Sequence, residues 1–363
     1  MRIAIDCIPL LLRSAGVKTY IYNWYRSMRR LAAGDTILAW PYLKPSDRYS
    51  HEESLVSAPG TLARLALLHA ATYLRLPVVD WLGPRVDVFH ASQQMWNPPR
   101  STRLTATLYD MTCWLVPETH SARNVQGARL FAERVMRRAD GLISISESTR
   151  QDAVRILGLD PEKVDVIYPG IAEAFFHARP ERPQRPYVLF VGTVEPRKNL
   201  GTLLDAWIQV TASLSSEFDL VVAGPAGWGD PSTLARLRAG DGGVRYLGYV
   251  PEEDLPGLTA GATVFVYPSL YEGFGLPLGQ AMAAGVPVIT SNVSSMPEVA
   301  GDAALLVDPR SPAEIAAALE RLLLSPDLRA TLSKNGLARA QRYTWDACAR
   351  QSLAFFRRLT VGS

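Results

Sequence analysis

The amino-acid sequence predicts an α/β protein with parallel sheets in two domains. Short apolar runs typical of buried strands alternate with helical stretches through most of the chain, which favours parallel sheets covered by helices. The 363 residues, of which 48% are hydrophobic, exceed what one ordinary core organises. A segment rich in proline and arginine, residues 178–186, is the best candidate for a linker between the two domains.

The expected first domain opens on a buried strand at residues 2–6. After a loop with a single glycine, Gly16, residues 17–31 are expected to form a helix that mixes basic residues with tyrosine and tryptophan. That composition suits a membrane interface, but the same aromatic side chains can pack on the sheet of their own domain. A second apolar stretch flanked by arginines, residues 61–76, has the same two interpretations.

Polar residues follow the next two expected strands, VDVFHAS (86–92) and LTATLYDMT (104–112). Ligands of open α/β sheets bind outside the carboxyl ends of the strands. His90, Tyr109 and Asp110 are therefore candidates for the wall of a binding cleft. For His90 the alternative is a hydrogen-bonded structural residue without a ligand.

The expected second domain repeats the order of strand, loop and helix. The strand at 187–191 leads to Gly192 and then to EPRKN, where Arg197 and Lys198 stand side by side just before a helix. Two adjacent bases in such a place can neutralise a diphosphate, although the same pair also occurs on plain surfaces. The run FDLVVAGPAGWGD repeats the pattern, and its Gly224 permits the close approach of a flat ligand.

The most informative stretch is YPSLYEGFGLPLGQAMAAGVPVIT, residues 267–290. It predicts the end of a strand, a loop with Glu272, a helix that starts after Gly273 and Gly275, and a further strand. Glycines let backbone N–H groups approach a ligand, and the helix dipole adds about half a positive charge there. Such a loop favours an anion or a polyhydroxylated ligand, whose hydroxyl groups Glu272 can bind. Taken by itself, the stretch also fits an ordinary tight turn.

Composition and cysteine usage argue against several other classes of protein. The net charge is a modest +3, with a basic excess in the first half, and we expect no nucleic-acid partner. Cys7, Cys113 and Cys348 have neither metal nor redox spacing, so we assign them no chemistry and expect a reducing cytoplasm. The sequence has no uncharged run of the about 18 residues that span a bilayer, and charges at Asp6 and Arg13 disfavour a signal peptide.

Five motifs occur in the order and spacing of one family: GTVEPRKNL, GPAGWGD, LGYVPEEDL, YPSLYEGFGLPLGQAMAAGVPVI and SSMPEVAGDAALLVDP. The sequence thereby resembles the retaining family 4 glycosyltransferases of the GT-B fold, particularly bacterial polysaccharide mannosyl- and rhamnosyltransferases. The resemblance is dense over residues 186–310 and weaker over the first domain. It implies two Rossmann-like domains with parallel sheets facing a central cleft. Residues 1–172 and a returning C-terminal helix at 344–363 would form the acceptor side, and residues 173–343 would bind the nucleotide sugar.

The resemblance also implies roles for single residues. Arg197 and Lys198 would bind the donor diphosphate in place of a metal ion, Glu272 would contact the donor sugar, and Asp110 completes the expected catalytic set. Backbone groups near Tyr249 and Val250 would hold the base. The expected donor-binding residues are Gly16, Gly192, Gly224, Tyr249, Val250, Gly273, Phe274, Gly275, Leu276 and Gln280, and the candidates on the acceptor side are His90 and Tyr109.

Three positions depart from the family pattern. Gln280 stands where the family has the second of two glutamates, and its neutral amide can still hydrogen-bond ribose hydroxyls. Tyr109 stands where many relatives have a histidine near the reacting centre, which leaves the catalytic helper open, with Asp110 beside it. Gly16 is alone where two or three glycines are common, so Ser14 or backbone groups are expected to help close over the donor.

These observations predict a retaining, metal-independent hexosyltransferase without a cofactor. It would transfer mannose or rhamnose from a nucleoside-diphosphate sugar, with GDP-mannose expected first, to a glycan or lipid-linked glycan in polysaccharide or glycoconjugate biosynthesis. We expect it in the cytoplasm, in peripheral contact with the inner membrane. The alternatives are a non-catalytic nucleotide-sugar-binding subunit, to which Gln280 and Tyr109 point, and a GT-B epimerase or phosphorylase. A dinucleotide-dependent oxidoreductase is disfavoured because no GxGxxG follows the first strand.

Overall fold

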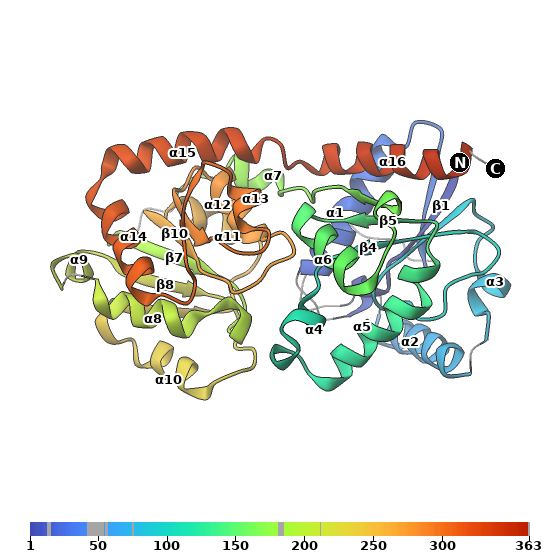
Figure 1. The fold of residues 1–363 in the computed structure, drawn as a ribbon, viewed down its shortest axis with the longest axis horizontal. Helices are drawn as coiled ribbons and strands as arrows, with labels where there is room; N and C mark the ends of the chain where they lie inside the picture. The colour runs from blue at the N-terminus through green and yellow to red at the C-terminus, as the bar shows by residue number, and fades with distance from the viewer. Residues whose placement is uncertain are drawn as a thin grey trace. The chain divides into compact units, whose positions relative to one another are not determined.

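The chain forms two compact units, each with its own sheet (Figure 1). Unit 1 comprises residues 1–170 and 345–363, and unit 2 comprises residues 171–344. The boundaries predicted from the sequence, 172/173 and 343/344, lie next to these divisions. The computed structural model describes residues 1–12, 16–41, 54, 57–74, 76–180, 185–210 and 212–361.

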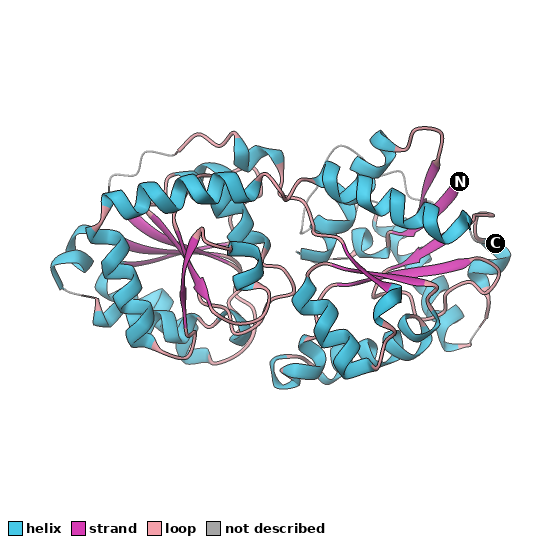
Figure 2. Ribbon diagram, turned by 45° about the horizontal axis from the view of Figure 1, so that its top comes forward, coloured by secondary structure: helices cyan, strands magenta, loops and turns pink. Residues whose placement is uncertain are grey.

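Unit 1 is built on a six-stranded parallel sheet with the strand order β2-β1-β3-β4-β5-β6. Its strands are short and mostly buried, as expected of a parallel sheet with both faces covered by helices (Figure 2). The strands are β1 (Arg2–Asp6), β2 (Thr36–Trp40), β3 (Val88–Ala91), β4 (Arg103–Leu108), β5 (Gly141–Ser144) and β6 (Val164–Val166). The α-helices of the unit are α1 (Gly16–Leu31), α2 (Ala58–Tyr73), α3 (Val78–Leu82), α4 (Thr112–Leu115), α5 (Ala122–Arg134), α6 (Glu147–Leu157) and α16 (Trp345–Val361), and its 3-10 helices are η1 (Ile8–Leu11), η2 (Pro117–Thr119), η3 (Met136–Arg138) and η4 (Pro161–Lys163).

Unit 2 also has a six-stranded parallel sheet, with the strand order β12-β11-β10-β7-β8-β9. The two sheets confirm the predicted α/β class with parallel sheets. The strands are β7 (Tyr187–Val191), β8 (Asp219–Ala223), β9 (Val244–Gly248), β10 (Val264–Tyr267), β11 (Val288–Ser291) and β12 (Ala304–Val307). The α-helices are α7 (Glu173–Phe176), α8 (Leu200–Gln209), α9 (Ala212–Glu217), α10 (Pro231–Ala239), α11 (Leu255–Ala260), α12 (Leu276–Ala283), α13 (Met296–Ala300), α14 (Pro312–Leu324) and α15 (Pro326–Ala340), and the 3-10 helices are η5 (Pro196–Lys198) and η6 (Asp241–Gly243).

Helix α1 packs its aromatic residues inside unit 1. The side chains of Tyr20 and Trp24 are 2% and 0% exposed, and even Lys18 is fully buried, where its Nζ donates to the carbonyl of Leu12 at 3.0 Å. The indole Nε1 of Trp24 donates to Ser352 Oγ of α16 at 2.9 Å. The membrane-interface interpretation of this helix is therefore wrong, since its aromatic side chains are part of the core.

The C-terminal helix α16 lies beside α1 in unit 1 (Figure 1). Its Phe355 and Phe356 are 2% and 0% exposed, and Arg357 forms an ion pair with Asp35 at 2.7 Å. Exposed ion pairs contribute little to stability, so the buried aromatic rings are the main reason why this helix stays on unit 1.

Candidate functional site

The predicted site residues of unit 2 lie at one edge of its sheet. Because all six strands are parallel, their carboxyl ends share that edge, outside which ligands of such sheets bind. Gly192 follows β7, Gly224 follows β8 and Tyr249 follows β9, while Glu272 lies in the loop after β10. Strand β10 is paired directly with β7, so the loops that follow these two strands are neighbours.

The predicted glycine Gly224 is needed for backbone packing at this edge. Gly224 has a φ of +148°, and a Cβ atom there would lie 2.0 Å from the carbonyl oxygen of Gly192. A side chain at position 224 would therefore push the loop after β8 away from the loop after β7. Tyr249 is exposed and Val250 half-buried in the loop after β9.

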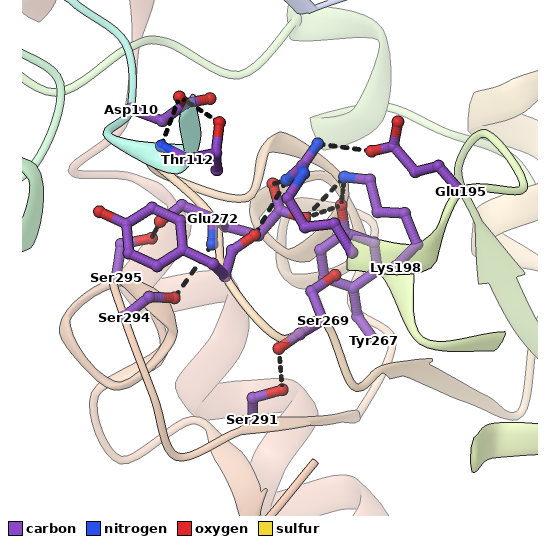
Figure 3. Close-up of polar contacts among 12 residues, drawn as sticks. Asp110, Thr112, Glu195, Lys198, Tyr267, Ser269, Glu272, Ser291, Ser294 and Ser295 are labelled. Atoms are coloured by element: carbon purple, nitrogen blue, oxygen red, sulfur yellow. Dashed lines mark hydrogen bonds and ion pairs between the residues drawn. The ribbon is translucent and has the colours of Figure 1, made fainter. Parts of the chain in front are cut away.

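The centre of the site is an ion cluster between the loops after β7 and β10 (Figure 3). Lys198 Nζ lies 2.6 Å from Glu272 Oε1, and a guanidinium nitrogen of Arg197 lies 2.7 Å from Glu272 Oε2. Glu272 and Lys198 are 7% and 9% exposed. The family resemblance implies separate ligand partners for these residues, the diphosphate and the sugar. In the structure they are paired with one another.

Two further residues complete the cluster. Glu195 Oε1 pairs with the second terminal nitrogen of Arg197 at 2.6 Å, which gives two cations and two carboxylates. The hydroxyl of Tyr267 donates to Glu272 Oε1 at 3.0 Å and accepts from Lys198 Nζ. Tyr267 is absent from the predicted site because it reads as one more apolar residue of a buried strand. Only its place at the end of β10 could have drawn attention to it.

The pKa values of the cluster follow from burial and charge. Burial alone would raise the pKa of Glu272, but the charges of Arg197 and Lys198 outweigh it and hold that pKa at about 2. Burial, and then the charge of Arg197, lower the pKa of Lys198. Burial and the charge of Glu272 raise the pKa of Tyr267 well above its ordinary value, so its hydroxyl stays neutral and keeps its proton.

Two residues with a left-handed backbone flank the cluster. Asn199, next to Lys198, has a φ of 61°, and its Nδ2 donates to the carbonyls of Pro268 and Pro309 at 3.0 and 2.6 Å. Ser294 has a φ of 53°, and its Oγ accepts from the backbone N–H of Glu272 at 3.1 Å. In the described part of the chain they are the non-glycine residues with positive φ, a conformation that clusters at functional sites.

The loop after Glu272 leads into helix α12. Gly275 precedes the helix with a φ of +85°, and a Cβ there would lie 2.5 Å from the terminal methyl group of Met296. The ring of Phe274 is buried and packs edge-on against Tyr343 at 5.1 Å, so its side chain belongs to the core. The other predicted residues of this segment are Gly273, which is buried, and Leu276 and Gln280, which are half-buried and share one face of α12.

In unit 1 the structure corrects the assignment of His90. Its Nδ1 and Nε2 lie 2.9 Å from the hydroxyls of Thr105 and Thr107, and the side chain is 1% exposed. Burial lowers its pKa to about 3, so the ring is neutral at physiological pH. With both nitrogens occupied and no access from outside, His90 is a structural residue and not part of an acceptor site.

Tyr109 is also buried, and its ring packs edge-on against Tyr20 at 5.2 Å, which corrects its assignment as an acceptor contact. Asp110 is half-buried, and its Oδ1 accepts from the backbone N–H and the hydroxyl of Thr112 at 3.1 and 2.7 Å (Figure 3). Gly16 is exposed at the start of α1. Ser14 lies outside the described residues.

A buried carboxylate that is absent from the predicted site residues organises the edge of unit 1. Asp6, at the end of β1, accepts from the backbone N–H of Ile8 at 3.0 Å and from the N–H and hydroxyl of Ser92 at 3.2 and 2.5 Å. It thereby joins the segments that follow β1 and β3. Burial raises its pKa to about 6.

Beside these two segments lies a largely apolar pocket with a volume of about 410 Å³. Residues of η1, α2 and α3 form its apolar walls, and the loop after β3 adds an amide-rich side. The lining residues are Ile8, Leu12, Leu62, Leu65, Ala66, Leu76, Val78, Val79, Gln94, Met95, Trp96, Asn97 and Arg123.

Two families match the chain in sequence. "Glycosyl transferases group 1" matches residues 172–339, and "Glycosyl transferase 4-like domain" matches residues 15–170. The O-antigen chain mannosyltransferase B of Escherichia coli is 32% identical over 285 residues, which cover 75% of this chain and 75% of that protein. Seven other curated relatives are also glycosyltransferases by name, and the match to this chain covers 29% to 61% of their length.

Solved structures with the same fold include two of low sequence identity. Sucrose-phosphate synthase from Thermosynechococcus elongatus superposes with a TM-score of 0.73 at 21% identity over the whole of both chains. Anabaena HepE, in complex with UDP and glucose, superposes with a TM-score of 0.70 at 18% identity over 99% of this chain and 100% of its own. At these identities the likeness shows the fold, which is the GT-B fold with its two Rossmann-like domains.

Proposed function

The chain belongs to the family 4 glycosyltransferases, and we propose that it is a retaining mannosyltransferase of polysaccharide biosynthesis that uses a nucleoside-diphosphate sugar. The observation that carries this proposal is the buried cluster of Arg197 and Lys198 with Glu272 at the carboxyl edge of the sheet in unit 2. Mannose is proposed because the relative covered over three quarters of its length is named a mannosyltransferase.

In the proposed mechanism Arg197 and Lys198 bind the donor diphosphate. During transfer the bond between the anomeric carbon and the diphosphate oxygen breaks, and negative charge grows on that oxygen. Two fixed cations stabilise this growing charge in the transition state more than they stabilise the bound donor in the ground state, which lowers the barrier. If each charge-assisted contact contributes about 1.5 to 3 kcal/mol, loss of one slows turnover by about 10- to 150-fold.

The proposed retention follows from attack on the same face as the leaving group. The acceptor oxygen bonds to the anomeric carbon as the diphosphate departs, and its proton passes to a diphosphate oxygen. Glu272 is proposed to bind a sugar hydroxyl once the diphosphate has taken over its cations. Asp110 is proposed as a polar contact on the acceptor side. With two cations already at the diphosphate, no metal ion is needed, and activity should persist in excess EDTA.

The donor is proposed to be GDP-mannose, with dTDP-rhamnose or a UDP-sugar as the next choices. Gly224 and the loop at Tyr249 and Val250 would receive the nucleoside at the same edge of the sheet. The amide of Gln280, half-buried on α12, would hydrogen-bond a ribose hydroxyl.

The acceptor is proposed to be a glycan on a lipid carrier. Support comes from the apolar pocket at the carboxyl ends of β1 and β3 and from exposed side chains near it: Leu62 is 70% exposed and Trp81 64% exposed. Such residues also suit a peripheral membrane contact. No helix in the described ranges combines the length and the apolar character of a membrane span.

The membrane contact is tested by sedimentation with anionic phospholipid vesicles. The variants Leu62→Asp and Trp81→Asp should reduce the bound fraction. The control Leu324→Asp, which changes a 68% exposed leucine of unit 2, should not. Equal binding of all three variants and the wild type would contradict the proposed contact.

The donor site is tested by thermal-shift titration with GDP, UDP, dTDP and ADP. One nucleotide should raise the melting temperature of the wild type and have no effect on Arg197→Ala. The matched control is Arg185→Ala, whose arginine pairs with Asp219 at 3.0 Å next to the amino end of β7. Incubation with the corresponding nucleotide sugar, and NMR of the product anomer, then test transfer and retention. Nucleotide binding with neither transfer nor hydrolysis would identify a non-catalytic subunit instead.

A further inference from the structure

We infer that Tyr267 is a positioning residue of the transfer reaction: its buried hydroxyl holds the Lys198 ammonium and the Glu272 carboxylate in one fixed place. This inference rests on the proposed function, because it assigns a role within the same donor site. Tyr267 is the last residue of β10 and is fully buried.

The hydroxyl of Tyr267 joins both charged groups at once. It donates to Glu272 Oε1 at 3.0 Å and accepts from Lys198 Nζ, which itself lies 2.6 Å from the same carboxylate oxygen. The three polar atoms therefore form a closed triangle. Each makes a contact with both of the others, so movement of one is resisted by two hydrogen bonds.

The tyrosine is the rigid member of this triangle. Its ring lies 5.8 Å from the ring of Phe190 and 6.0 Å from that of Phe265, and its backbone carbonyl accepts from the hydroxyl of Thr290 on the adjacent strand at 2.9 Å. Lysine and glutamate side chains have several rotatable bonds, whereas the phenol has two and is held by its neighbours. The position of the charged pair is thus set by a residue of the sheet.

A neutral phenol suits this role because it can donate and accept at the same time. Arg197 and Glu195 are the other charged groups of the cluster, and they compete for neither hydrogen bond of the phenol. When a diphosphate takes Lys198 away from the carboxylate, the hydroxyl still donates to Glu272 and keeps it oriented towards the sugar. Phenylalanine fills the same volume but provides neither hydrogen bond.

Tyr267→Phe is the test, with Tyr187→Phe as its matched control. Tyr187 is the first residue of β7, is 3% exposed, and donates its hydroxyl to the carbonyl of Leu258, so both variants lose one buried hydroxyl from the same sheet. We expect Tyr267→Phe to lower kcat about tenfold or more with the donor KM changed less than threefold. Its pH profile for kcat/KM should also narrow, because Glu272 and Lys198 each lose a partner of their charged form. Tyr187→Phe should change neither quantity.

A second readout does not depend on activity. In protein labelled with ¹³C at glutamate carboxyls, the Glu272 signal, assigned with Glu272→Gln, should titrate at higher pH in Tyr267→Phe than in the wild type and in Tyr187→Phe. An unchanged Glu272 titration, or a pH profile of the same width as that of Tyr187→Phe, would overturn the inference. If the wild type binds no nucleoside diphosphate, the proposed function is refuted instead. The carboxyl titration distinguishes the two cases, because it requires no bound nucleotide.

Discussion

Replacing Glu272 by glutamine should affect nucleotide binding and sugar transfer in opposite directions. In the structure its carboxylate lies 2.6 Å from Lys198 Nζ and 2.7 Å from a guanidinium nitrogen of Arg197. A diphosphate that needs these cations must therefore compete with the Glu272 carboxylate for them. A glutamine amide carries no charge, so the nucleotide meets less competition.

The size of both effects follows from the same contacts. A charge-assisted hydrogen bond contributes about 1.5 to 3 kcal/mol. If the nucleotide no longer has to break one such contact, the Kd of the nucleoside diphosphate should fall about tenfold or more. If Glu272 binds the sugar during transfer, loss of that contact should lower kcat/KM for the complete donor by about 10- to 150-fold.

Isothermal titration with the nucleotide and steady-state transfer assays measure the two quantities. The matched control is Asp219→Asn, which changes a buried carboxylate between Arg185 and Arg245 at the opposite edge of the same sheet. Loss of a partner from a buried ion pair costs about 3 to 5 kcal/mol, so Glu272→Gln should be less stable. Asp219→Asn should lose less stability, because its partners Arg185 and Arg245 are 38% and 56% exposed. Only Glu272→Gln should bind the nucleotide more tightly. Weaker nucleotide binding in Glu272→Gln would refute the reasoning.

The same carboxylate predicts a pH dependence of stability. Its pKa is about 2 in the folded protein and 4.5 without the cluster. The stabilisation of the folded state by the ionised Glu272 is therefore fully present above pH 4.5. It is lost as the pH falls from 4.5 towards 2, and the free energy of unfolding decreases by about 3 kcal/mol in all. Urea unfolding of unit 2 at several pH values should show a smaller loss in Glu272→Gln. An identical slope in both proteins would contradict the assignment.

Three further predictions concern the rest of the chain. His90 has a pKa of about 3 in the folded protein and 6.5 when free, so the free energy of unfolding should fall by about 2 kcal/mol between pH 7 and pH 5. In urea unfolding, His90→Asn should show a weaker dependence on pH, and the variant should retain transfer at pH 7. Loss of transfer would instead indicate that His90 belongs to the active site. Gly224→Ala places a Cβ 2.0 Å from the carbonyl of Gly192 and should lower the free energy of unfolding by about 3 kcal/mol or more. Gly201→Ala, whose Cβ would make only an ordinary contact with the Thr233 hydroxyl at 3.6 Å, should not; equal stabilities would contradict the close packing. Removal of residues 345–363 should abolish cooperative unfolding of unit 1, monitored by near-UV circular dichroism, and an intact transition would show that α16 is dispensable.

Local features of the sequence predicted the architecture, and they also drew attention to most residues of the proposed donor site. An apolar run followed by glycine or charged residues predicts a strand that ends at the edge of the sheet where ligands can bind, because strand composition and turn chemistry are local properties. Arg197 and Lys198 could be picked out in this way, as could Glu272 with its flanking glycines. Strand β2, with the sequence TILAW, is absent from the predicted strands.

Partners and burial were decided by the tertiary structure. Lys198 and Glu272 are 74 residues apart in sequence and meet because β7 pairs with β10, and strand order is not encoded in any one segment. The same pairing brings Lys198 to Tyr267, whereas the other partner, Glu272, follows Tyr267 in the adjoining loop. For His90 and the aromatic residues of α1 the sequence left two interpretations open, and the threonines of β4 and the returning helix α16 enclose them. Composition and periodicity report which residues can be buried, whereas the packing of distant segments decides which of them are.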